Sequence, residues 1–333
     1  MTPKPHSKTC LRDKSKRLPV RKKSAMTIAI GTYFADRCDR LPYEPAFSYR
    51  QVRAHGFILC ADTKIVASDG VTTYGTKLNC TQSMSGEYFA IANASEDGNA
   101  ADSLAHEILT TLVKSVPGNT PMMPAAAQQL VGPSVKKVMT EWHKSYTQSL
   151  PPSIQFILGC AGDLHHSLYF CEPPSTVLAK SWLQLPITIG TGGRAIDPLL
   201  DTVFTGDSDI KQTLIRLAYL MYRAKKDQAR DCGGNTDVLV IKSMGSHPFR
   251  VTHKEMARAE AIAPEIDRII LQCLDGLLSQ YGRDNQEKFK TMISEWYSAQ
   301  ESAIAKLEFP SLQGLELSFS HQPPEAKKQR SPD

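Results

Sequence analysis

The chain has 333 residues, of which 41% are hydrophobic, enough to form a sizeable core in one large domain or two ordinary ones. The formal net charge of +5 is concentrated at the start: residues 1–25 contain nine Lys or Arg and one Asp, and the remainder carries 30 basic and 33 acidic residues. The remainder has no basic stripe with interleaved aromatic residues and no apolar run of about 18 residues, so we expect neither nucleic-acid binding nor a membrane span.

Residues 1–26 are polar, basic and unpatterned, and they lack the apolar stretch of a secretory signal. Three interpretations stay open: a basic targeting peptide or propeptide, a disordered tail, or codons upstream of the real start. In the last case Met26 is the initiator, and its removal before a small residue exposes Thr27.

The cysteines and histidines predict no metal site. None of the eight cysteines forms a Cys-x-x-Cys pair, and several lie within apolar strand-like runs, as reduced cysteines do in a cytosolic protein. The only histidine cluster, His165-His166, has no partner at metal-ligand spacing. Since no nucleotide-binding glycine motif or P-loop follows a strand either, we expect a cytoplasmic protein without a cofactor.

The first predicted strand covers 27–34, where small and β-branched residues alternate. A charged loop with two prolines is predicted over 35–54. Short strands follow at 56–61, 64–68, 76–80 and 88–92.

The hydrophobic period then changes to that of helices, predicted over 99–116 and, after Gly132-Pro133, over 134–148. Strands are predicted at 154–160, 167–171, 177–179 and 187–190, helices at 194–205 and 209–229, and a last strand at 236–241. This order predicts an α/β (α+β) fold in which two packed sheets are flanked by helices on both sides. A helical extension is expected over 246–310, followed by a disordered polar tail, 311–333.

Thr27 is the principal candidate for chemistry. If the mature chain begins there, one residue carries both a hydroxyl nucleophile and a free α-amine, whose reference pKa of about 7.7–8.0 suits a general base. The alternative is an ordinary β-branched strand residue.

Asp62 and Lys77 are predicted to form a pair. Asp62 ends a fully apolar strand, where an unpaired carboxylate is costly, so it needs a partner, and Lys77 is the obvious one. The alternatives are a turn aspartate that caps neighbouring amides and a solvent-facing strand lysine.

Five stretches occur in an order and spacing that resemble a known family. They are 27–31, 55–64, 76–78, 189–193 and 231–238. Together they resemble the proteasome family of N-terminal-nucleophile (Ntn) hydrolases, including its bacterial proteasome-like members, over about residues 27–242, which predicts a domain of this type over 27–245. The resemblance implies a four-layer α/β/β/α sandwich of mostly antiparallel sheets and amide hydrolysis through an acyl-enzyme.

The resemblance also implies roles for particular residues. Lys77 stands at the position of the family's active-site lysine, where a cation beside Thr27 lowers the amine's pKa. Thr191 and Cys232 stand where the family has serines that orient the amine. Gly98 lies near the glycine whose N–H forms the oxyanion hole.

The chain departs from the family at three places. Ala229 stands where the family has an aspartate, Cys232 replaces a serine, and Met26 replaces the glycine before the nucleophile. Two hypotheses follow: a threonine peptidase acting on peptides or proteins, or a catalytically inactive subunit with an assembly or binding role. The resemblance further implies a homo-oligomer of rings or stacked rings, which the helical extension would cap or block.

Overall fold

The computed structural model describes residues 27–35, 54–66, 72–118, 122–147, 150–163, 165–180, 186–204, 208–242, 247–268, 294 and 306–312. The predicted segment 1–26, most of the predicted loop 35–54, and most of the predicted tail 311–333 lie outside these residues. So do residues 246, 269–293 and 295–305 of the predicted helical extension.

The first sheet has five antiparallel strands in the order β10-β1-β2-β11-β12. Their bounds are β1 Ala29–Ala35, β2 Ala54–Asp62, β10 Ile187–Ile189, β11 Thr236–Lys242 and β12 Phe249–Val251. β1 and β2 are buried almost throughout, because this sheet is covered on both faces, and their residues are correspondingly apolar.

The second sheet is also antiparallel, in the order β5-β6-β7-β8-β9, and β3 and β4 form a separate two-stranded ribbon. The strands are β3 Lys64–Val66, β4 Thr72–Tyr74, β5 Leu78–Gln82, β6 Tyr88–Ser95, β7 Ile154–Ala161, β8 His166–Glu172 and β9 Thr176–Lys180. The Tyr33 hydroxyl of β1 links the sheets, since it donates to the Lys180 carbonyl (3.0 Å) and accepts from the Leu168 N–H (2.7 Å).

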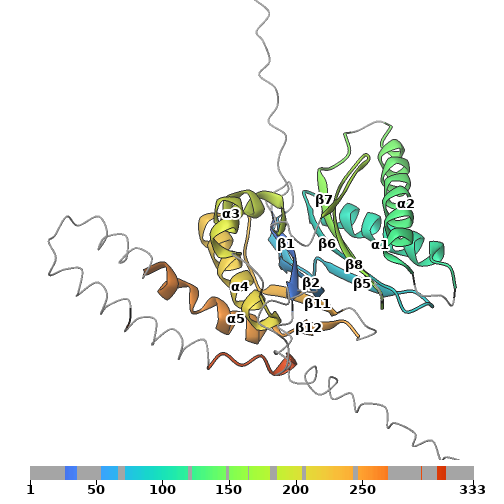
Figure 1. The fold of residues 1–333 in the computed structure, drawn as a ribbon. Coiled ribbons are helices and arrows are strands. Elements are labelled where there is room, and N and C mark those ends of the chain that lie inside the picture. Colours follow the sequence, from blue (N-terminus) through green and yellow to red (C-terminus); the bar gives the residue numbers. More distant parts are fainter. Residues whose placement is uncertain are drawn as a thin grey trace, which may run out of the picture.

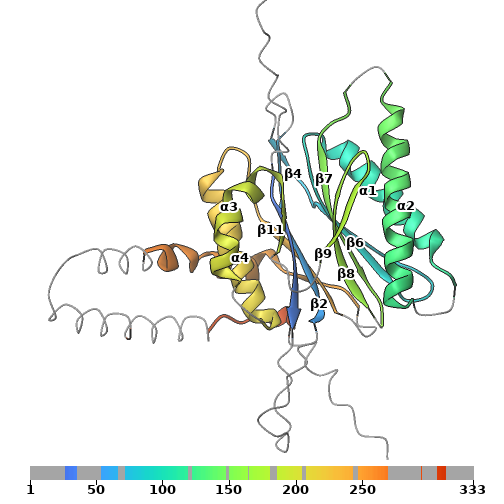
Figure 2. The ribbon, with the colours of Figure 1, turned by 45° about the horizontal axis from the view of Figure 1, so that its top comes forward.

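Helices cover the outer face of each sheet (Figures 1 and 2). Their bounds are α1 Gly98–Ser115, α2 Pro124–Ser145, α3 Gly190–Val203, α4 Ile210–Asp227 and α5 His253–Glu260. α1 and α2 lie on the second sheet, and α3, α4 and α5 lie on the side of the first.

Three hydrophobic clusters separate these four layers. One lies between the first sheet and α3–α5, one between the second sheet and α1–α2, and the third between the two sheets. The sheets approach closely at Gly159, where a Cβ would lie 2.2 Å from the Phe57 ring. The predicted α/β/β/α sandwich is therefore confirmed.

Some element boundaries differ from the prediction. α2 begins at Pro124, ten residues before the start that Gly132-Pro133 indicated, and Pro133 lies inside the helix. Proline has no N–H, so the helix carbonyl four residues before Pro133 lacks its usual donor. Because Pro133 is exposed, water can hydrate that carbonyl. Residues 249–251, which we placed in the helical extension, form the edge strand β12.

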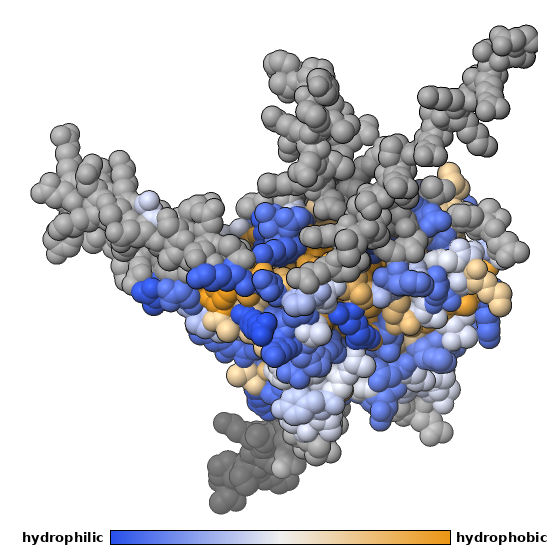
Figure 3. Space-filling view, turned by 90° about the horizontal axis from the view of Figure 1, so that it is seen from below, coloured by the Kyte–Doolittle hydropathy of each residue, from blue (hydrophilic) through white to orange (hydrophobic). Residues whose placement is uncertain are grey.

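Seen from below the view of Figure 1, hydrophilic side chains cover much of the described surface, with hydrophobic ones in patches between them (Figure 3). None of the helices in the described ranges combines the length and apolar character needed to cross a membrane.

Candidate active site

Thr27 lies two residues before β1 and is 1% exposed. Its carbonyl accepts a hydrogen bond from the Gly192 N–H in the first turn of α3 (3.1 Å). Gly190 has φ +79°, and a Cβ there would lie 2.2 Å from the Thr27 carbonyl oxygen. The start of α3 therefore holds Thr27 in place, and this close approach requires glycine at position 190.

The Lys77 ammonium reaches Thr27 from the segment just before β5. It donates to Thr27 Oγ1, to Asp62 Oδ1 (2.6 Å) and to the Lys64 carbonyl. The Thr27 hydroxyl in turn donates to Asp62 Oδ1 (2.5 Å). Three side chains from separate parts of the sequence thus form one buried hydrogen-bonded network.

Asp62 ends β2, is fully buried, and forms the ion pair with Lys77 that its position after an apolar strand predicted. It also accepts the N–H groups of Ile28 (3.2 Å) and Gly233 (2.9 Å). These contacts satisfy a carboxylate that would otherwise be costly to bury, and they join β1, β2 and the turn before β11.

Burial lowers the pKa of Lys77, and the charge and hydrogen bond of Asp62 oppose that shift. Asp62 is therefore the main group that favours the ammonium form of Lys77. In that form Lys77 can donate to a nearby hydroxyl and can stabilise a developing alkoxide.

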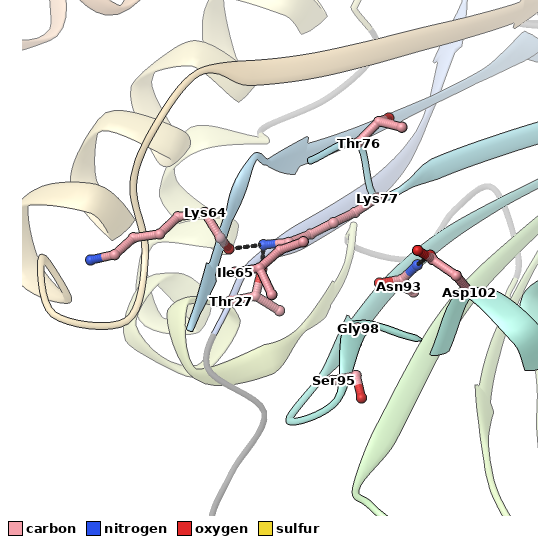
Figure 4. Close-up of a pocket in the computed structure, with 9 residues that line it drawn as sticks. All are labelled: Thr27, Lys64, Ile65, Thr76, Lys77, Asn93, Ser95, Gly98 and Asp102. Carbon is pink, nitrogen blue, oxygen red and sulfur yellow. Dashed lines mark hydrogen bonds between the residues drawn. The ribbon is translucent and has the colours of Figure 1, made fainter. Parts of the chain in front are cut away.

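Thr27 and Lys77 open onto a narrow pocket with a volume of about 10 Å³, room for little more than one water molecule. Gly98, the first residue of α1, lines the same pocket as Thr27, and its N–H lies in the first turn of the helix, where N–H groups have no intrahelical partner. Figure 4 shows the Lys64 side chain directed away from the pocket while its carbonyl receives Lys77. The pocket is lined by Thr27, Lys64, Ile65, Thr76, Lys77, Asn93, Ser95, Gly98 and Asp102.

Thr191 and Cys232, the other two candidates, are not among these lining residues. Thr191 lies in the first turn of α3, next to Gly192. Cys232 is 1% exposed and belongs to the core beneath α3 and α4, and a Cβ on Gly192 would lie 2.5 Å from its sulfur. Burial, reinforced by the charge of Asp62, raises the pKa of the Cys232 thiol to about 12, so this thiol is neutral near pH 7.

Sequence reasoning missed Asn93 and Asp102. Asn93 is buried within the apolar strand β6, and a buried amide in such a run signals that a polar partner is near. Its side chain donates to Asp102 Oδ1 (3.1 Å). Asp102 gave no such signal, because an acidic residue near the start of a helix is commonplace.

Within the described residues, no group of three or more His, Cys, Asp or Glu side chains is placed to hold a metal ion.

Solved structures with the same fold carry the name Anbu. Anbu (ancestral beta-subunit) from Yersinia bercovieri matches with a TM-score of 0.56 at 13% identity, covering 74% of this chain and 97% of that chain. The Anbu (Gly-1) mutant from Hyphomicrobium sp. strain MC1 matches with a TM-score of 0.54 at 13% identity, covering 74% and 96%. The helical assembly of the Anbu complex from Pseudomonas aeruginosa matches with a TM-score of 0.55 at 15% identity, covering 78% and 99%.

No protein-family model matches the chain, and no curated protein matches it. At 13–15% identity the likeness establishes that the chain shares the fold of these Anbu structures.

Proposed function

We propose that this chain, with its proteasome-like β-subunit fold, is an N-terminal threonine amidohydrolase that cleaves peptides or proteins through an acyl-enzyme. The observation that carries the proposal is the contact of the Lys77 ammonium with Thr27 Oγ1, in a network with Asp62 and at the edge of a pocket. A buried ammonium aimed at a threonine hydroxyl has a direct chemical use, because it stabilises the oxyanion form of that hydroxyl.

In the proposed reaction, Thr27 Oγ1 attacks the carbonyl carbon of the substrate and its proton passes to the α-amine of Thr27. The Gly98 N–H donates to the oxyanion of the tetrahedral intermediate. The C–N bond then breaks, the amine returns the proton to the leaving nitrogen, and an ester to Thr27 remains. Water attacks this ester with the same amine as base, which releases the acid and restores the hydroxyl.

The remaining residues position these groups. Asp62 holds the Lys77 ammonium in place and keeps it charged despite burial. We propose that Thr191 helps to orient the α-amine, because it adjoins the residue that holds the Thr27 carbonyl. For Cys232 we retain the same proposed role, although its sulfur packs into the core rather than lining the pocket.

The position of Cys232 favours a second candidate function, a catalytically inactive subunit that retains the fold for assembly or binding. A neutral thiol in the core is a weak hydrogen-bond partner for an α-amine. In this case the Lys77 network stabilises the fold without performing chemistry.

Labelling of the purified full chain separates the two functions. The intact mass reveals whether the chain begins at Thr27, and a peptide epoxyketone or β-lactone probe reports a reactive nucleophile. We expect one adduct on the Thr27 peptide, none in Thr27→Ala, and an unchanged adduct in Thr32→Ala, which alters a buried threonine of β1, five residues after Thr27.

Labelling that survives Thr27→Ala, or full activity in a chain that retains Met26, contradicts the proposed hydrolase. A chain that begins at Thr27 and resists every probe supports the inactive subunit.

We also propose that the chain forms a homo-oligomer of rings or stacked rings. The helical assembly described for the Anbu complex from Pseudomonas aeruginosa supports self-association, and the ring arrangement follows only from the sequence resemblance. Native mass spectrometry should give a multiple of the 36.8 kDa chain, less any residues removed before Thr27, and a monomer at micromolar concentration would contradict this. A cytoplasmic location is likewise proposed, supported by the free cysteines of the described residues, and cell fractionation tests it.

A further inference from the structure

The outer strands of the two five-stranded sheets differ in how their free edges are protected. β10 and β12 are only three residues long, and Arg250 places a charge at the middle of β12. β9 ends with Lys180. Short length and charged side chains are common means by which an edge strand avoids pairing with another chain. β5 lacks such protection, because its five residues include no charged residue and no proline, and its register with β6 has no bulge.

Alternate residues of β5 direct their backbone groups away from the sheet. The Ser83 N–H donates to the Glu87 carbonyl of the turn before β6 (2.8 Å). At the other end, the Asn93 N–H donates to the Lys77 carbonyl (3.1 Å). Every second residue of an antiparallel pair bonds to the neighbouring strand, so the odd-numbered residues bond to β6. The even-numbered residues of β5 therefore direct their N–H and carbonyl groups outward.

Cys80 and Gln82 provide the free hydrogen-bonding groups of this edge. The carbonyl of Leu78, the other even-numbered residue, accepts from the Arg250 guanidinium (2.8 Å). Among the described residues, no hydrogen bond reaches the backbone N–H or carbonyl of Cys80 or Gln82. A second β5 strand that runs in the opposite direction offers the complementary groups at the same spacing and brings no like charge.

The helix beside this edge carries charges that suit the same arrangement. A hollow of about 350 Å³ lies between β5 and α1, lined by Thr81 from the strand and by Thr110 and Lys114 from the helix. Glu107, Thr110 and Lys114 are three and four residues apart and share one face of α1. Glu107 and Lys114 are exposed and lie on either side of Thr110. An antiparallel copy therefore brings the acidic half of this face opposite the basic half.

We propose that two copies of this chain associate through β5, which joins their second sheets into one continuous antiparallel sheet across a twofold axis. Cys80 of each copy pairs with Gln82 of the other, and each pair exchanges two backbone hydrogen bonds. The axis then passes beside Thr81, and Lys114 of each copy faces Glu107 of the other. The inference goes beyond the proposed function and holds whether or not Thr27 reacts.

Amide hydrogen exchange of the full chain, resolved to single residues, tests the strand pairing. The N–H groups of Asn79 and Thr81 donate to β6 and should exchange slowly in every folded variant. In wild type at about 100 µM, the N–H groups of Cys80 and Gln82 should also exchange slowly, because they donate to the second copy. A monomer in sedimentation at this concentration, or an assembly in which Cys80 and Gln82 exchange rapidly, overturns the inference.

Gln82→Pro removes an outward N–H and leaves the bonds to β6 in place, so the fold should persist while the dimer dissociates. The Cys80 amide should then exchange at least about tenfold faster than in wild type. Gln82→Ala, which keeps the N–H, is the matched control and should remain dimeric. Equal association of the two variants contradicts the pairing of β5 strands.

A charge exchange on α1 tests the arrangement without altering β5. Glu107→Lys and Lys114→Glu each place like charges across the axis, so each should raise the dissociation constant of the dimer about tenfold in sedimentation equilibrium. The double variant Glu107→Lys/Lys114→Glu restores opposite charges and should return to within about threefold of wild type. Single variants that associate like wild type, or a double variant weaker than either, overturn the proposed axis.

Discussion

Two buried clusters lie near opposite ends of β6, and each combines a carboxylate, a basic side chain and a hydroxyl or thiol. The lysine cluster consists of Thr27, Asp62 and Lys77. Lys77 lies beside the C-terminal end of β6, where the Asn93 N–H donates to the Lys77 carbonyl (3.1 Å). The histidine cluster precedes the strand and consists of Glu87, Cys160 and His165.

The histidine cluster is built for structure. His165 Nδ1 lies 3.0 Å from the Met122 carbonyl and must donate to it, and Nε2 lies 3.3 Å from the Cys160 sulfur and 3.6 Å from Glu87 Oε2. Glu87 Oε1 accepts the Met122 N–H (2.8 Å). Cys160 is fully buried, and burial raises the pKa of its thiol well above the ordinary range. The cluster therefore joins the segment before α2 to the second sheet.

The difference teaches that residue types alone do not identify a reactive site. Both clusters contain a potential nucleophile beside a basic group, but only the lysine cluster places that nucleophile beside an ammonium group on a pocket wall.

Lys77→Met should have the largest effect. Loss of the ammonium beside Thr27 is expected to reduce probe labelling at least about 100-fold. It also leaves the fully buried Asp62 without a cation, which should lower the free energy of unfolding by about 3 kcal/mol. Labelling kinetics and urea denaturation measure the two effects.

The double variant Asp62→Asn/Lys77→Met separates these effects. It removes the unpaired charge, so much of the stability should return while labelling stays low. Labelling of Lys77→Met at the wild-type rate would reduce the lysine cluster to a structural feature like the histidine cluster.

Gly190→Ala should disturb the lysine cluster through the backbone. The positive φ and the contact with the Thr27 carbonyl predict a loss of about 2 kcal/mol in the free energy of unfolding and at least a tenfold loss of labelling. Gly132→Ala is the control, because a Cβ there meets no atom within 4 Å in a helix interior and should stabilise the fold slightly. Equal behaviour of the two variants would show that α3 does not position Thr27.

Glu87→Ala tests the histidine cluster. It removes the acceptor of the Met122 N–H and leaves a small cavity, so the free energy of unfolding should fall by about 2 kcal/mol. Labelling of Thr27 in the folded protein should stay within about twofold of wild type. A large loss of labelling at unchanged structure would mean that the two clusters are coupled across β6.

The lysine cluster was largely predictable from sequence because its members stand at the ends of strands. Asp62 ends an apolar run and therefore requires a partner, and Thr27 lies two residues before the first strand. Two adjacent antiparallel strands and a facing segment bring these ends together, so the order of the elements constrained the site.

Other features were not predictable because they depend on tertiary packing. The pattern Gly132-Pro133 indicates a helix start, yet buried side chains on both sides of it, such as Ala127 and Val138, hold one continuous helix. The direction of the Cys232 side chain depends on its contact with Gly192, 40 residues away in sequence. Asp102 acquires its place on the pocket wall only when α1 packs on the second sheet.

Cys232→Ser should have the smallest effect at neutral pH and a characteristic one in alkali. The folded protein keeps the Cys232 thiol protonated up to about pH 12, whereas the thiol of the unfolded chain ionises near its ordinary pKa of about 8.5. Between these two pH values the folded state binds more protons than the unfolded state, so the free energy of unfolding falls as the pH rises.

Serine does not ionise in this range, so Cys232→Ser removes one contribution of this kind and leaves those of the other buried cysteines. Between pH 8 and pH 10, wild type should lose about 1–2 kcal/mol more stability than Cys232→Ser, as measured by urea denaturation at each pH. Labelling of Thr27 at pH 7.5 should change less than about threefold, because the sulfur packs behind the pocket wall. Parallel pH profiles for the two proteins would mean that the thiol ionises in the folded state, and the lysine cluster would then have an anion behind it that its geometry does not accommodate.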